Sequence, residues 1–142
     1  DLRWAEASMH EYGRGLQVEP FVEIEAEFVL HSWLGRDGSC LTGNPARLVC
    51  DQDGAWLTTE RASDLAAAEE RELRAAHDRS AEALGRAGYF GPFATDAFRW
   101  RDGRASRFQP LSEINARYTM GWFAGFGDGQ REWIERIQAQ DA

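Results

Sequence analysis

The sequence contains no lysine. All of its 16 basic residues are arginine, against 24 aspartates and glutamates, and the net charge is -8. A chain of this charge repels a phosphate backbone, so the composition argues against nucleic acid as a partner. Carboxylate clusters suit metal ions better. Any bound phosphate group would have to be gripped by the planar fork of arginine rather than by a compact ammonium.

Long apolar runs and a secretion signal are also missing. No apolar run approaches the roughly 20 residues of a membrane helix, and the N-terminus lacks the charged-then-apolar pattern of a signal peptide. We therefore expect a soluble, cytoplasmic protein with no membrane partner. The sequence starts at Asp1 within an amphipathic stretch, and we expect it to be part of a longer polypeptide.

Cysteine and histidine are sparse. Cys40 and Cys50 have neither metal-ligand spacing nor the pattern of a disulfide framework, so two states are open: reduced thiols, which we favour, or one bridge. His10, His31 and His77 show no spacing typical of a metal site or a catalytic triad, and we assign them no role.

Local patterns predict one α+β domain spanning residues 1–142, with a mainly antiparallel sheet packed by a long helix and by shorter terminal helices. The clearest strand is Val22–Leu30, where apolar and polar residues alternate. The Ala-rich stretch Ser63–Gly88 predicts the long helix, with Ser63 or Asp64 as its N-cap and Gly88 at its end. The remaining elements are shorter: helices at Leu2–Tyr12 and Arg131–Gln138, strands near Cys40–Leu41, Arg47–Cys50 and Trp56–Thr58, and a hairpin formed by Phe93–Trp100 and Arg107–Asn115.

An acid, an amide and a guanidinium alternate along the last predicted strand, at Glu113, Asn115 and Arg117. Alternate residues of a strand project from one face. Carboxylate and amide oxygens are ligands that hard cations prefer, and Asp96 on the partner strand is the natural third ligand. The alternative is a solvated polar face in which Arg117 makes a salt bridge.

The register of the hairpin decides between these interpretations. A two-residue turn at Asp102-Gly103 would place Asp96 opposite Gln109, too far from Glu113 to share an ion. A looser loop from about Asp102 to Arg107 would place Asp96 opposite Glu113, with Cβ atoms about 5 Å apart. We predict the second register.

These motifs resemble the C-terminal half of ATP-grasp enzymes. The stretch "GYFGPFATDAFRWRDG" followed by "PLSEINARYTMG" is similar to the paired strands that hold the magnesium ions of ATP in that family. The resemblance implies magnesium ligands at Asp96, Glu113 and Asn115, and it implies that Arg117 meets the transferred phosphate or the acyl-phosphate.

The upstream stretch "VEPFVEIEAEFVLH" resembles the adenine hinge of the same family. The resemblance places Glu19 near the exocyclic amine, the Pro20 carbonyl as its acceptor and the Val22 N–H as a donor to the ring. It also places Glu27 on the ribose hydroxyls, although the spacing from Glu19 to Glu27 is one residue longer than in comparable members. Glu23, Glu25 and Glu27 are alternatively one solvated face.

The resemblance implies an ATP- and magnesium-dependent ligase that activates a small-molecule carboxylate as an acyl-phosphate for attack by a nucleophile. The family's N-terminal subdomain, with its lysines and Gly-rich loop, has no counterpart before Glu19. We expect that subdomain to be a missing partner, and the chain alone to be inactive and to bind ATP poorly. Two rivals are a non-catalytic ATP-grasp-like module that binds nucleotide or protein, and a plain α+β interaction domain.

Overall fold

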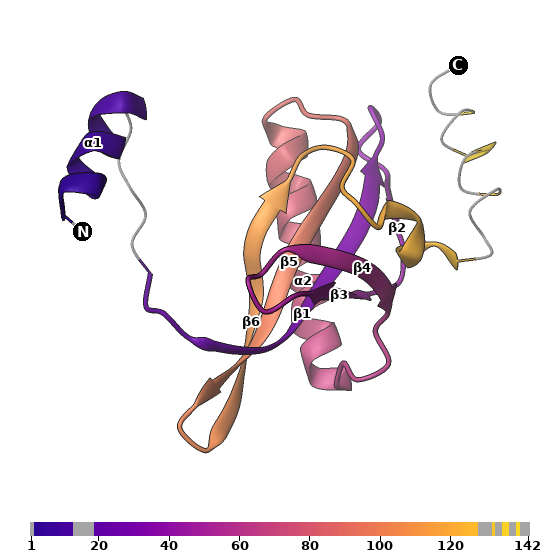
Figure 1. Cartoon of the computed structure of the whole chain (residues 1–142). Helices are drawn as coiled ribbons and strands as arrows, with labels where there is room; N and C mark the ends of the chain where they lie inside the picture. Colours follow the sequence, from indigo (N-terminus) through magenta and orange to yellow (C-terminus); the bar gives the residue numbers. More distant parts are fainter. Residues whose placement is uncertain (1, 13–18, 128–131, 133–134, 137–138, 140–142) are drawn as a thin grey trace.

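The computed structural model describes residues 2–12 and 19–127, together with positions 132, 135, 136 and 139. Its elements are α1 (Leu2–Tyr12), β1 (Glu23–Leu34), β2 (Cys40–Thr42), β3 (Ala46–Cys50), β4 (Trp56–Arg61), α2 (Ala67–Arg86), β5 (Gly91–Asp102), β6 (Ala105–Asn115) and the 3-10 turn η1 (Trp122–Gly125). They confirm the predicted α+β class (Figure 1). The predicted helix at Arg131–Gln138 falls largely outside the described residues.

Strand β1 is the centre of a fully antiparallel sheet with the order β4-β3-β1-β5-β6. It pairs with β5 from Glu23 to Leu34. Its other edge is shared by β3, which pairs near Phe28, and by β2, which pairs at the C-terminal end. The strand runs four residues beyond the predicted end at Leu30, because Ser32 and Trp33 continue the alternation that directs side chains to the two faces.

Helix α2 covers one face of the sheet. Phe28 and Leu30 of β1, Ala97 of β5 and Leu73 of α2 are at most 2% exposed and form one cluster. The other face carries a smaller apolar cluster built on Val29. Because α2 buries only one face, the second face is available for a site.

A polar network crosses the layer between α2 and the sheet. His77 of α2 lies with Nε2 2.6 Å from Ser32 Oγ and Nδ1 2.7 Å from Thr95 Oγ1, and its ring stacks on Phe93 at 4.6 Å between centroids. All four residues are fully buried. Burial lowers the pKa of His77 to about 3. His77 is thus a neutral core histidine whose two nitrogens both have partners.

The N-terminus of α2 differs from the prediction of a Ser63 or Asp64 cap. The capping residue is Ala66, whose backbone N–H donates to Glu69 Oε2 at 3.0 Å. Asp64 instead pairs with Arg47 at 2.9 Å, because an ion pair with the sheet is available to it. The predicted end at Gly88 is confirmed, with φ +80° at that residue. None of the described helices is long and apolar enough to cross a bilayer.

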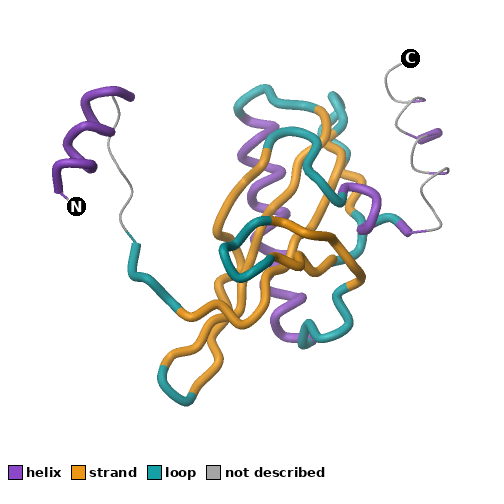
Figure 2. The backbone as a smooth tube through the Cα atoms, in the orientation of Figure 1, coloured by secondary structure: helices purple, strands orange, loops and turns teal. Residues whose placement is uncertain are grey.

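The chain crosses the second face of the sheet after β6. Residues 116–121, hereafter the crossing segment, lead from the β6 edge to η1 beside β4 (Figures 1 and 2). Gly121 ends this segment with φ +81°, and a Cβ there would lie 2.2 Å from Thr59 Oγ1 of β4. The close approach and the positive φ both require glycine.

We expect Gly121→Ala to lower the free energy of unfolding by about 2–4 kcal/mol, because it adds an overpacking contact with Thr59 to the cost of a positive φ. Gly38→Ala is the matched control: its φ is +84°, yet nothing lies within 4 Å of the added Cβ. Urea unfolding of both variants measures the difference. Equal losses would show that the Gly121–Thr59 approach contributes nothing.

Candidate functional site

The hairpin of β5 and β6 places Asp96 directly opposite Glu113, as predicted. The route to that register differs from the expected loose loop. The turn is tight, since Asp102 pairs with Ala105, and Phe98 pairs with Gln109. The pairing then jumps to Asp96 and Glu113, so that β6 has two more residues than β5 in this interval. A bulge around Pro110, which has no N–H for the ladder, corrects the register.

Asp96, Glu113 and Asn115 are therefore neighbours on the face opposite α2. The Asn115 amide nitrogen donates to Asp96 Oδ2 at 3.0 Å, and Asn115 is 7% exposed. The pKa of Asp96 is raised to about 6, first by burial and then by the charges of Glu113 and Glu27. Such crowding of negative charge around a partly buried carboxylate is typical of a cation site.

Glu27 belongs to the same face. It lies two residues before Val29, which pairs with Asp96, so both side chains project from one side of β1. Between Glu19 and Glu27, β1 has a bulge at Glu25, so Glu25 has no partner in the ladder with β5. Without the bulge, strict alternation from Ile24 would direct Glu27 toward α2.

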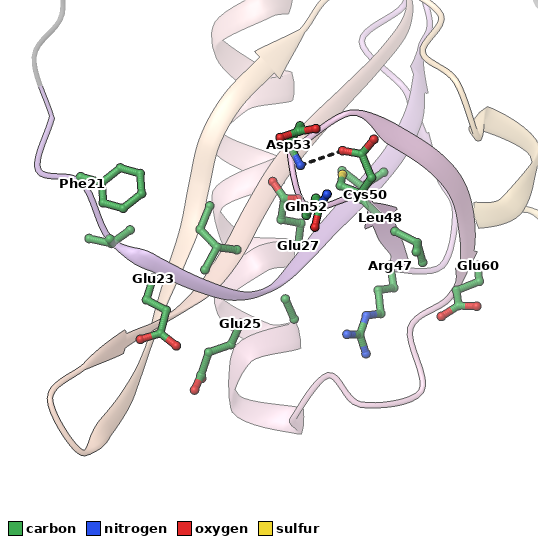
Figure 3. A pocket seen from close by; sticks show the side chains of 16 residues that line it. Phe21, Glu23, Glu25, Glu27, Arg47, Leu48, Cys50, Gln52, Asp53 and Glu60 are labelled. Atoms are coloured by element: carbon green, nitrogen blue, oxygen red, sulfur yellow. Dashed lines mark hydrogen bonds between the residues drawn. The ribbon is translucent and has the colours of Figure 1, made fainter.

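A cavity of about 850 Å³ lies between β1 and the β3–β4 turn, and Glu27 lines it. Figure 3 shows Glu27 facing the turn that carries Gln52 and Asp53. Burial, followed by the neighbouring Glu27, raises the pKa of the Cys50 thiol to about 11, so this thiol is unreactive at neutral pH. Both cysteines are free, as favoured from the sequence.

Arg117 does not lie on the strand as predicted, because β6 ends at Asn115. It lies on the crossing segment, exposed to solvent, and its backbone N–H donates to the Asn115 carbonyl at 2.9 Å. Its positive charge acts on Asp96 and lowers the pKa of that carboxyl, opposing the effect of burial. The guanidinium is thus within electrostatic reach of the acidic site.

The residues of the predicted hinge line a second cavity, of about 620 Å³. Its lining from the hinge is Glu19, Pro20, Phe21 and Val22, and its lining from the β5–β6 hairpin is Phe98, Trp100, Gln109, Leu111 and Ser112. Phe98 and Trp100 share a face with Asp96. The cavity and the acidic site therefore lie on one face of the hairpin.

Sequence reasoning alone does not find most of this hairpin lining, since it gives no role to Trp100, Gln109 or Leu111. A signal exists for Trp100, which follows Asp96 at even spacing on a strand. Gln109 pairs with Phe98 because the turn is tight, and Leu111 lies within the bulge, so the predicted loose loop places neither of them here.

The described part of the chain holds no group of three or more His, Cys, Asp and Glu side chains arranged as a metal site. The candidate site is of another kind, because it has two carboxylates, Asp96 and Glu113, and its third ligand is the amide of Asn115. Because Asn115 uses its nitrogen toward Asp96, its carbonyl oxygen is the atom left as a ligand.

The sequence matches no family model and no curated protein. Its structure is similar to N5-carboxyaminoimidazole ribonucleotide synthetases. The enzyme of Thermus thermophilus matches with a TM-score of 0.57 and 24% identity over 84% of this chain. The enzyme of Staphylococcus aureus, complexed with ADP, matches with a TM-score of 0.51 and 13% identity over 71% of this chain. The enzyme of Thermotoga maritima matches with a TM-score of 0.50 and 18% identity over 76% of this chain.

The chain spans 31%, 25% and 27% of these three proteins, respectively. They are ATP-grasp enzymes, and the part they share with this chain includes the α+β arrangement described above. The chain therefore has the fold of a portion of the ATP-grasp synthetases.

Proposed function

We propose that this chain supplies the adenine hinge and the magnesium-binding strands of a ligase that uses ATP to activate a carboxylate as an acyl-phosphate. The observation that carries the proposal is the register of Asp96 with Glu113, beside a cavity that the hinge residues line. A solvated strand face would not require a two-residue bulge to bring these acids opposite each other.

The donor set fits magnesium. Asp96 and Glu113 offer carboxylate oxygens, Asn115 offers an amide oxygen, and the raised pKa of Asp96 reflects in part the repulsion between the acids without a cation. Magnesium bound there would neutralise charge on the β- and γ-phosphates of ATP. The protein's own part is to hold the acids in place and to aim Arg117 at the transferred group.

The hinge would bind the adenine ring through its backbone. In this proposal the Pro20 carbonyl accepts from the exocyclic amine near Glu19, and the Val22 N–H donates to the ring. Phe98 and Trp100 line the same cavity and offer flat apolar surfaces to the base. Glu27 would accept hydrogen bonds from the ribose hydroxyls.

The rest of the active site would come from a second subdomain that brings further cations to the phosphates, and from a carboxylate substrate that the described residues do not identify. The lack of lysine favours one other candidate, a non-catalytic module that binds nucleotide without turnover. The two proposals differ in the effect that Glu113 would have on turnover.

A direct test is the binding of Mn²⁺, used as a paramagnetic substitute for Mg²⁺. We expect Mn²⁺ to broaden the NMR signals of Asp96, Glu113 and Asn115 first, because these residues would be its ligands. Asp96→Asn should weaken binding at least tenfold. Glu60→Gln is the control, since Glu60 is an exposed acid on β4 that lines the cavity between β1 and the β3–β4 turn. Equal Mn²⁺ affinity of the two variants would reject the site.

A further inference from the structure

The crossing segment carries Arg117 over the sheet and is held at both ends. At its start, Asn115 is hydrogen-bonded to Asp96. At its end, Gly121 packs against Thr59. Between these points the exposed side chain of Arg117 makes no hydrogen bond or ion pair that the described residues show, so its position depends on the backbone beneath it.

His31 provides a hydrogen bond in the middle of the segment. It projects from β1 on the site face, is fully buried, and lies with Nε2 3.0 Å from Thr119 Oγ1. The edge-to-face contact with Trp122, at 5.6 Å between centroids, fixes the ring from the η1 side. Its Nδ1 has no hydrogen-bond partner among the described residues and faces the backbone of Gly125. The Thr119 contact is therefore the polar contact that orients this ring.

A buried polar side chain with one unsatisfied atom is costly, and a leucine could fill the same space without that cost. The hydrogen bond to Thr119 therefore indicates that His31 does more than fill space in the core. Thr119 is two residues after Arg117, and the Arg117 N–H is bonded to the Asn115 carbonyl two residues before it. Fixing Thr119 leaves the backbone at Arg117 little freedom.

We infer that His31 is a positioning residue, which acts through Thr119 to hold Arg117 over the site formed by Asp96, Glu113 and Asn115. This inference rests on the proposed function, since it needs a phosphate group for Arg117 to meet. Arg117 is proposed to contact the transferred phosphate, so the effect of His31 should be felt by ATP and not by ADP.

The experiment is an NMR titration of the 142-residue chain with Mg·ATP and, separately, with Mg·ADP at millimolar concentrations. Thr119→Val removes the hydroxyl at nearly constant shape, and we expect it to raise the Kd for Mg·ATP three- to tenfold with little change for Mg·ADP. Thr119→Ser keeps the hydroxyl and should restore the wild-type ratio of the two affinities. A purely structural role for the hydrogen bond would not change that ratio.

The double variant Thr119→Val/Arg117→Gln decides whether Thr119 acts through Arg117. We expect it to bind Mg·ATP with the same affinity as Arg117→Gln alone, because Thr119 cannot affect binding through a guanidinium that is absent. Additive losses would overturn the inference. So would an unchanged ATP affinity in Thr119→Val when Arg117→Gln weakens it, and this result would leave the proposed function intact.

Failure of the proposed function has a different signature. If Arg117→Gln changes neither affinity, Arg117 does not meet the phosphate, and the inference falls with that role. His31→Gln gives an independent check from the other side of the bond, because its amide can still reach Thr119. It should show a smaller change in the ratio than Thr119→Val, and a larger change would count against the inference.

Discussion

Replacing Glu113 by Gln is expected to leave the fold intact and, if this chain belongs to the proposed ligase, to lower the turnover of that enzyme about a thousandfold. The side-chain volume hardly changes, and Glu113 is exposed, so the free energy of unfolding should shift by no more than about 0.5 kcal/mol. The loss of one anionic ligand weakens a hard-cation site and leaves phosphate charge uncompensated during transfer, which costs several kcal/mol. A coupled ADP-release assay and thermal melting measure the two effects.

The matched control is Glu60→Gln, the same change at an exposed acid on β4. It should retain full turnover. An unchanged rate for Glu113→Gln at saturating magnesium would remove Glu113 from the site and would favour the non-catalytic module. The alternation with Asn115 and Arg117 would then require a structural reason.

Lowering the pH from 7 to 4 is expected to reduce the free energy of unfolding by about 3–6 kcal/mol. Burial lowers the pKa of His77 to about 3 and that of His31 to about 4, against an ordinary value of 6.5. The unfolded chain therefore binds more protons than the folded chain in this range. The stability that the neutral rings contribute is complete above pH 6.5 and is lost as the pH falls toward 4 and 3.

Asp96 has the opposite effect on the pH dependence of the free energy of unfolding. Its pKa is raised from 3.8 to about 6, mainly by burial, so the folded chain gains stability as this carboxyl takes up a proton below pH 6. One raised carboxyl offsets only part of the effect of two buried histidines, which is why we expect a net loss.

Urea unfolding at pH 7, 6, 5 and 4 tests this dependence. His77→Gln should be less stable at pH 7, since it loses the stacking on Phe93, and its pH dependence should be shallower than that of the wild type. The free energy of unfolding of Asp96→Asn should depend on pH more steeply than that of the wild type. A wild-type free energy that does not change between pH 7 and 4 would contradict the assignment of His31 and His77 as neutral buried groups.

Strand alternation was enough to predict which residues of β6 share a face. Glu113 and Asn115 lie two residues apart on β6, and a period of two places them on one face. Arg117 lies beyond the end of β6, so alternation does not fix its direction. The face that α2 covers could be predicted for a similar reason, because Phe28 and Leu30 are apolar at the alternate positions.

Register was harder to predict, because it depends on where a ladder skips residues. The tight turn at Asp102 and Ala105 would by itself have misaligned Asp96. Pro110 indicates an irregularity in the strand, but it does not tell how many residues the bulge takes up. His31 and His77 were missed because a lone histidine gives no pattern. Their partners Thr119 and Ser32 lie 88 and 45 residues away, respectively, and only the folded chain brings them together.

The bulge in β6 also determines which changes in length the hairpin can tolerate. Adding or removing one residue from each strand between the turn and Phe98 keeps the same cross-strand pairs beyond it, so the tip can vary without moving the acids. A single residue inserted between Gln109 and Glu113 would reverse the phase of everything that follows. Glu113 and Asn115 would then point toward α2, Ser112 would stand opposite Asp96, and Ile114 would take the position of Asn115. The alignment of the acids therefore does not depend on the length of the hairpin tip, whereas it does depend on the number of residues around Pro110.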